Sequence, residues 1–155
     1  MSDATEGQVA VADTSAMDVF AELDTRAKAS EGVEIEIFKP DGETSGIFIK
    51  VLGQDSDAYT KLKEKQDRAR VRLISKGGRG AVDGIYDNSK TYEMELVVAC
   101  CVSWRHTNGK AMPFRIGEED ENQTRKFFER YPVVYDQVRV GISDRANFTK
   151  VPAKN

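Results

Sequence analysis

The chain contains few of the residues on which catalytic, disulfide-bonded and membrane proteins depend. Its 155 residues include one histidine, one tryptophan and two cysteines. No apolar run reaches the roughly 18 residues that a membrane-spanning helix needs. The first residues, MSDATEGQVAVADTSAMD, have no cationic start and no apolar segment, so they do not resemble a secretory signal. We therefore expect a protein that stays in the cytoplasm of the cell that makes it.

The scarcity of cysteine and histidine also limits the chemistry. Cys100 and Cys101 are adjacent, and adjacent cysteines rarely reach relaxed disulfide geometry, so we expect two free, buried thiols. A nucleophilic pair of Cys101 with His106 is disfavoured, because five residues on a helix turn through about 140° away from a common face. Zinc requires about four nitrogen or sulfur ligands, more than the chain offers at suitable spacing.

Two further patterns have only a superficial likeness to catalytic motifs. The segment KGGRGAVDG shares its glycines with phosphate-binding loops, but it lacks the Lys-Ser or Lys-Thr pair that such loops require. Glu118 and Glu119 are more typical of acids at a helix start than of a general acid/base pair. We expect no catalytic residue, no cofactor and no metal, and hence not an enzyme.

The length and composition favour one globular domain. Apolar residues make up 39% and charged residues 32% of the chain, and a chain of this size can bury a sizeable core. Residues 1–14 are small, polar and acidic, which predicts a flexible tail. The prediction is one domain over residues 15–148, followed by a second flexible tail over 149–155.

Hydrophobic periodicity predicts an α+β fold that is mainly helical. A helix from Ser15 ends at Gly32, and its apolar stripe consists of Met17, Phe20, Ala21, Leu23 and Ala27. Alternating apolar residues then predict two strands, about 33–39 and 46–52, joined at Pro40-Asp41-Gly42. Such an N-terminal β-hairpin has one apolar face, so it must pack on helices.

The rest of the chain reads as helices and loops. Asp55 and Ser56 can cap a helix whose apolar face carries Tyr59, Leu62, Ala69 and Leu73. A loop is predicted over 76–88 and a central apolar helix over 89–106, although LVVACCV, 96–102, could instead be a buried strand. After a loop at Asn108-Gly109, helices are predicted to begin within 118–122 and at Pro132.

Charge and aromatic residues suggest two kinds of binding surface. Residues 61–79 carry eight cations and two acids in a chain of net charge −3, so this helix is either a solvated face, which can also meet the acidic first helix, or a contact for nucleic-acid phosphates. The second kind is apolar. Five aromatic residues near the C-terminus can belong to the core or anchor a partner: Phe127, Phe128, Tyr131, Tyr135 and Phe148.

Several stretches, taken in order, resemble the small tail assembly chaperones of long-tailed bacteriophages. They are FAELDTRAKASEGVEIEIFKPDG, IKVLGQDSDAY, the apolar segment that ends at Trp104, and YPVVYDQVRVGISDRANF, and together they span roughly residues 20–148. Family members often carry Ser or Thr before a Glu-Asn helix start. Here that stretch is RIGEEDEN, which leaves the cap of the helix undecided.

The resemblance implies a non-enzymatic chaperone in the host cell cytoplasm. Members of the family bind hydrophobic helical segments of the tape measure protein and keep it soluble while the tail tube polymerises. It also implies the tail tube protein and a second copy of the chain as further contacts. An apolar helix pair suits helix-in-groove binding, and the residues expected to bind the partner are Phe127, Phe128, Tyr131, Val134, Val138 and Phe148. The alternatives are a structural virion protein of the tail or neck and, with less support, a nucleic-acid-binding protein that uses residues 61–79.

Overall fold

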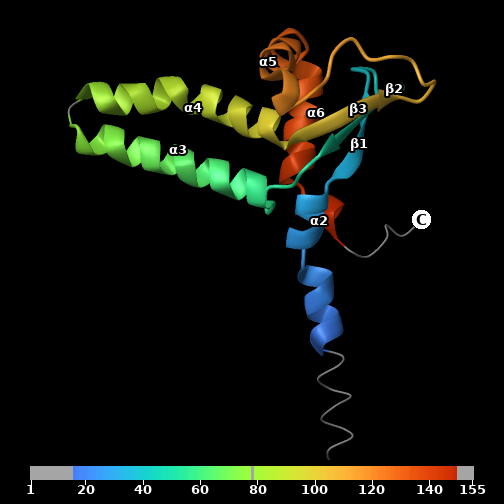
Figure 1. Ribbon diagram of the computed structural model, residues 1–155, viewed down its shortest axis with the longest axis horizontal. Helices are drawn as coiled ribbons and strands as arrows, with labels where there is room; N and C mark the ends of the chain where they lie inside the picture. Colours follow the sequence, from blue (N-terminus) through green and yellow to red (C-terminus); the bar gives the residue numbers. More distant parts are fainter. Residues whose placement is uncertain (1–15, 78, 150–155) are drawn as a thin grey trace, which may run out of the picture.

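The fold contains a three-stranded antiparallel sheet that lies beside helix α6 (Pro132–Ser143) (Figure 1). The protein is described by a computed structural model that covers residues 16–77 and 79–149. The tail predicted over 1–14, and all of the tail predicted over 149–155 except Thr149, therefore lie outside the described residues. The strands β1 (Val33–Phe38), β2 (Thr44–Val51) and β3 (Cys101–His106) are ordered β1-β2-β3. The predicted hairpin is confirmed, and its turn places Gly42 at a φ of 89°, which a residue with a side chain rarely adopts.

The third strand was not predicted. Helix α4 (Arg79–Cys100) ends where β3 begins, so the helix expected over 89–106 is wrong at its C-terminal end. The alternative strand at 96–102 is also wrong over 96–100, which are helical. The cause is tertiary: the N–H of Leu52 bonds to the Cys100 carbonyl at 2.8 Å, and the chain continues along the edge of β2. No glycine or proline marks this change from helix to strand.

Two long helices form an antiparallel hairpin that projects from the sheet (Figure 1). Helix α3 (Asp57–Ser75) and α4 pack along each other, and we call residues 57–77 and 79–95 the arm. The loop predicted over 76–88 is wrong, because α4 already begins at Arg79. The predicted apolar face of α3 is confirmed as the half-buried side that faces α4. Helix–helix packing therefore outweighs the low helix propensity of Gly80 and Gly84, about 1 kcal/mol each.

The N-terminal helix is divided in two. Residues 16–23 are helical, and α2 (Arg26–Glu31) follows after a break at Asp24 and Thr25. The Asp24 carboxylate accepts a hydrogen bond from the Arg26 N–H at 3.1 Å, which is the local bonding that competes with a continuous helix. Gly32 ends α2 as predicted, with a φ of 94° and its N–H bonded to the Lys28 carbonyl.

The C-terminal helices begin where their caps predict. A 3-10 turn, η1 (Glu118–Asp120), leads into α5 (Glu121–Arg130), and the Asp120 side chain accepts a hydrogen bond from the Gln123 N–H, which identifies the cap. Pro132 occupies the first turn of α6 (Pro132–Ser143), where its missing N–H costs little. A second 3-10 turn, η2 (Arg145–Phe148), follows.

The main core lies between one face of the sheet and α6. Ile35 approaches α6 so closely that a Cβ on Gly141 would lie 2.9 Å from the Ile35 Cδ1. The buried residues of this core include Ile37, Ile49, Val51, Val98, Phe128, Val138, Ile142 and Phe148. The opposite sheet face carries Glu34, Phe48 and Arg105, as the period-two alternation requires. The β-hairpin packed on helices is thus confirmed.

A polar cluster at Asp55 ties three segments together. Its carboxylate accepts hydrogen bonds from the Thr25 hydroxyl at 2.6 Å and from the Arg145 guanidinium at 2.7 and 2.9 Å. These bonds, Arg145 first and Thr25 second, lower the pKa of Asp55 to about 2. The cluster joins the residue before α2, the turn before α3, and η2.

Candidate functional site

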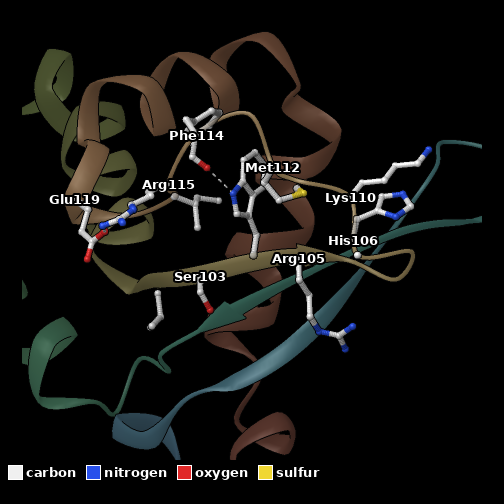
Figure 2. A pocket seen from close by; sticks show the side chains of 12 residues that line it. Ser103, Arg105, His106, Lys110, Met112, Phe114, Arg115 and Glu119 are labelled. Atoms are coloured by element: carbon white, nitrogen blue, oxygen red, sulfur yellow. Dashed lines mark hydrogen bonds and ion pairs between the residues drawn. The ribbon is translucent and has the colours of Figure 1, made fainter.

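An open groove runs along the outer edge of β3. Its volume is about 730 Å³, and its second wall is the loop that connects β3 to η1 (Figure 2). Val102 to His106 line it from the strand, while Lys110, Met112 and Phe114 line it from the loop. We call this feature the β3 groove. Its position at a sheet edge, beside an irregular loop, makes it the main candidate for a binding site.

Aromatic side chains form the inner wall of the β3 groove. The Trp104 ring lies 4.8 Å from the Phe114 ring and 5.1 Å from the Phe127 ring, centroid to centroid. The Phe127 ring in turn lies 5.0 Å from Tyr131. The Trp104 indole N–H donates to the Phe114 carbonyl at 2.8 Å, which fixes the loop over the strand (Figure 2). The groove thus joins the aromatic residues at the C-terminal end of α5.

The charged side chains that line the groove are three cations, Arg105, Lys110 and Arg115, and one acid, Glu119. Arg115 pairs with Glu119 at 3.0 Å, and Arg105 reaches the opposite sheet face, where it pairs with Glu34 at 2.7 Å. Lys110 lies beside His106 at the other end of the groove from Arg115 (Figure 2). Among the described residues, no carboxylate pairs with the Lys110 ammonium. A ligand with a carboxylate can therefore gain a charge interaction there.

The two thiols lie in the core and not in the groove. Burial raises the pKa of Cys100 to about 12, and burial raises that of Cys101 as well. Because the thiolate is the nucleophilic form, both side chains are unreactive at neutral pH. Cys101 and His106 stand at opposite ends of β3, about 16 Å apart at ~3.3 Å per residue. The structure therefore keeps Cys101 and His106 apart, as expected. They are separated by the length of an extended strand and not by their positions around a helix, which is the geometry we had assumed.

The described residues also offer no metal site. Residues 16–77 and 79–149 contain no group of three or more His, Cys, Asp or Glu side chains placed to hold a metal ion. The His106 Nδ1 accepts a hydrogen bond from the Asn108 N–H at 3.2 Å, so this nitrogen is engaged in the turn after β3.

Three of the six residues expected to bind a partner are core residues. Phe128, Val138 and Phe148 are 1%, 0% and 1% exposed, so they cannot touch another molecule in the folded state, and this part of the prediction is wrong. Phe148 packs against Gly53, where a Cβ would lie 3.0 Å from its ring. The sequence indicated apolar residues at helical spacing, and burial of one side of α5, α6 and η2 in the core accounts for them.

The other three predicted residues remain accessible. Tyr131 is 48% exposed, and Phe127 and Val134 are half-buried. Phe127 contacts Trp104, so the accessible part of the prediction adjoins the β3 groove. The groove residues Trp104, Met112 and Phe114 were not singled out, because Trp104 was assigned to a helix and AMPF to a loop. The signal that could have found them is one tryptophan close to a short apolar loop segment that contains proline.

A second apolar surface lies at the N-terminus. The segment 16–23 projects from the body beyond α2 (Figure 1). Its large side chains are more than half exposed: Met17 67%, Val19 55%, Phe20 63% and Leu23 68%. The apolar residues predicted for this helix are therefore solvent-exposed and are not part of the core of their own chain.

The basic segment predicted over 61–79 lies mostly on α3. Asp67 pairs with Lys63 and Arg70 on the same helix, and the Arg70 guanidinium lies 5.1 Å from the centre of the Tyr92 ring. We considered that cations of this segment could pair with acids of the N-terminal helix. The observed ion pair has the opposite polarity, because the acid Asp57 lies on α3 and the cation Arg26 lies on α2.

In the part of the chain that the structure describes, no helix combines the length and the apolar character needed to cross a membrane. Searches against models of protein families, curated proteins and solved structures found no match to the chain.

Proposed function

We propose that this protein is a non-enzymatic chaperone that binds apolar segments of a bacteriophage tape measure protein and keeps them soluble in the host cytoplasm during tail assembly. The β3 groove and the adjoining aromatic side chains of Trp104, Phe114, Phe127 and Tyr131 carry the proposal. The identity of the partner comes from the resemblance to tail assembly chaperones.

The chemistry of the groove favours binding over catalysis. An aromatic wall gains free energy from burying apolar area, about 25 cal/mol per Å², without any reactive group. The buried thiols stay protonated, as the raised pKa of Cys100 to about 12 indicates. A chaperone needs contact that is broad and reversible, and aromatic side chains supply it because they present large surfaces with few rotatable bonds.

Co-expression with a fragment of a tape measure protein tests the proposal. We expect the fragment to be insoluble alone and to form a soluble complex when this chain is present. Tyr131→Asp should reduce the soluble fraction, because it places a charge beside Phe127. Val140→Asp is the matched control, since Val140 is 56% exposed on α6. Equal insolubility of the fragment with and without the chain would refute the chaperone function.

Analysis of purified virions separates the chaperone from a structural protein of the tail or neck. A chaperone that acts during assembly should be absent from finished particles, or present only in traces, by quantitative mass spectrometry. Recovery of the chain at many copies per particle would favour the structural role instead.

A further inference from the structure

The two edges of the sheet differ in how their main-chain groups are satisfied. At the β1 edge, the side-chain amide of Gln137 accepts from the Phe38 N–H at 2.8 Å and donates to the Phe38 carbonyl at 2.9 Å. This primary amide occupies the position that a neighbouring strand would take. At the β3 edge the corresponding space is the open groove. An unpaired edge next to a cavity is a template for pairing with another segment.

The register identifies the main-chain groups that face the β3 groove. The Thr107 N–H donates to the Gly46 carbonyl at 2.8 Å, which places Thr107 among the residues bonded toward β2. Because these bonds alternate along an antiparallel strand, the N–H and C=O groups of Trp104 and His106 point the other way. The His106 carbonyl already accepts from the Gly109 N–H at 3.0 Å. Both main-chain groups of Trp104 and the His106 N–H therefore face the groove.

The length of the groove suits a short added strand. Val102 to His106 line one wall of the groove, so about five residues of β3 are available for pairing. At ~3.4 Å per residue, a partner strand of about four to five residues spans ~15 Å along this wall.

The lining specifies the side chains of the occupant. Trp104, Met112 and Phe114 form an apolar wall, and Lys110 at the rim has no carboxylate partner among the described residues. In an added strand, side chains alternate between two faces. The complementary segment carries an apolar or aromatic side chain against Trp104 and a carboxylate near Lys110.

The geometry points to strand addition: the β3 groove binds an extended segment of a partner polypeptide, paired through its main chain with Trp104 and His106. The segment has alternating apolar residues and one acidic residue. This inference rests on the proposed function, because it takes from it that the binding partner is a polypeptide. It adds that the segment is held in the extended form, in contrast to the helix-in-groove mode that the sequence suggested.

Trp104 is the only tryptophan of the chain, so its fluorescence reports on the groove directly. The probe is a short peptide, free of tryptophan, of alternating valine and threonine with one phenylalanine and one glutamate. We expect a saturable change in emission on titration. The same peptide N-methylated at alternate residues cannot donate the pairing hydrogen bonds, and it should bind at least about tenfold more weakly. Equal binding of both peptides, or binding of neither, would overturn strand addition.

Substitutions at His106 separate the main chain from the side chain. His106→Pro removes the N–H that faces the groove, while His106→Ala removes only the imidazole. Proline is tolerated on an edge strand when its nitrogen faces outward, and Arg105 already has the extended conformation that precedes proline. Peptide affinity should fall about tenfold more for His106→Pro than for His106→Ala, with unchanged circular dichroism as the fold control. Equal affinities for the two folded variants would contradict the main-chain pairing.

The charge on the rim gives an independent check. Lys110→Glu should lower the affinity for the peptide that contains glutamate by about three- to tenfold at low salt. This loss of affinity should be smaller at high salt. Lys61→Glu changes the net charge equally on an exposed part of α3 and should have no effect. An equal loss in both variants would show that net charge, and not Lys110, determines affinity.

The outcomes distinguish this inference from the proposed function. If the tape measure fragment is solubilised equally by His106→Pro and His106→Ala, the chaperone function stands and strand addition at this groove is wrong. If the short peptide binds but the fragment is not solubilised, the groove stands and the tape measure assignment is wrong. A second copy paired at the same edge is the competing occupant. It predicts a dimer in sedimentation without peptide, and a dimer that His106→Pro abolishes would overturn the inference.

Discussion

The sheet with α6 and the arm are stabilised in different ways. In the first region, side chains such as Ile49, Val51 and Val138 are fully buried between layers. In the arm, the only buried residue of α3 is Gln66, whose side-chain amide donates to the Tyr92 carbonyl at 2.9 Å, while Val71 and Ile74 are 61% and 60% exposed. The sheet region therefore depends on close packing of fully buried side chains, and the arm depends on packing of half-buried helix faces and on a few polar contacts.

The largest expected effect is the loss of stability caused by a cavity in the core of the sheet region. Phe128→Ala should lower the free energy of unfolding by about 3–5 kcal/mol, because Phe128 is 1% exposed and the space it leaves cannot fully collapse. Val71→Ala in the arm should change it by no more than about 0.5 kcal/mol. Urea denaturation followed by circular dichroism measures both. Similar losses for the two variants would refute the contrast between the regions.

Removal of a buried hydroxyl should also lower the free energy of unfolding, but by a smaller amount. The Thr124 side chain accepts from the Gly117 N–H at 2.9 Å and donates to the Asp120 carbonyl at 2.9 Å. Thr124→Val leaves both groups without this partner, so we expect a loss of about 1–3 kcal/mol in unfolding free energy. Thr60→Val is the control, because Thr60 makes a similar bond to the Ser56 carbonyl at an exposed position. If the control loses as much stability as Thr124→Val, burial is not the cause.

The Asp55 cluster should make stability depend on pH in the acid range. Its pKa falls from an ordinary 3.8 to about 2 in the folded state, chiefly through the hydrogen bonds from Arg145. The unfolded chain therefore binds this proton more readily, so the contribution is complete above about pH 4 and is lost as the pH falls toward 2. Thermal unfolding between pH 5 and 2 should show a smaller decline in Tm for Asp55→Asn than for the natural chain. Parallel curves for the two proteins would exclude Asp55 as the source.

The smallest effect is a gain in the arm. Gly84 lies in α4 with nothing within 4 Å of an added Cβ, so Gly84→Ala should stabilise the helix by about 0.5–1 kcal/mol. Gly141→Ala is the matched change on α6, where the new Cβ would meet the Ile35 Cδ1 at 2.9 Å, and it should destabilise the sheet region. Amide hydrogen exchange resolves the two regions. If both variants gained stability in this measurement, α6 would be packed less closely than the contacts of Gly141 indicate.

The sequence predicted the elements whose signals are local. The period-two strands of the hairpin, the cap at Gly32 and the start of α6 at Pro132 each follow from residues within one turn or strand. β3 could not be predicted in this way, because only pairing with β2 distinguishes 101–106 from a continuation of the apolar helix. The start of α4 was missed for the same reason, since glycines in the arm are offset by packing on α3.

The candidate site was predicted only in part. Phe127, Tyr131 and Val134 remain accessible. Periodicity cannot tell which apolar residues of the C-terminal segments join the core, and Phe128, Val138 and Phe148 do. The β3 groove depends on a strand edge and a loop that meet only in the folded chain. The sequence holds only an indirect signal for Trp104 and Phe114, the proximity of the tryptophan to a short apolar loop segment that contains proline.

The most direct test of the central claim is the fluorescence of Trp104 during binding of a tape measure fragment that lacks tryptophan. If the protein acts through apolar contact at the β3 groove, emission should shift and saturate at the same fragment concentration at which the soluble complex forms. A soluble complex that leaves Trp104 emission unchanged would contradict the account, because binding would then occur at another surface.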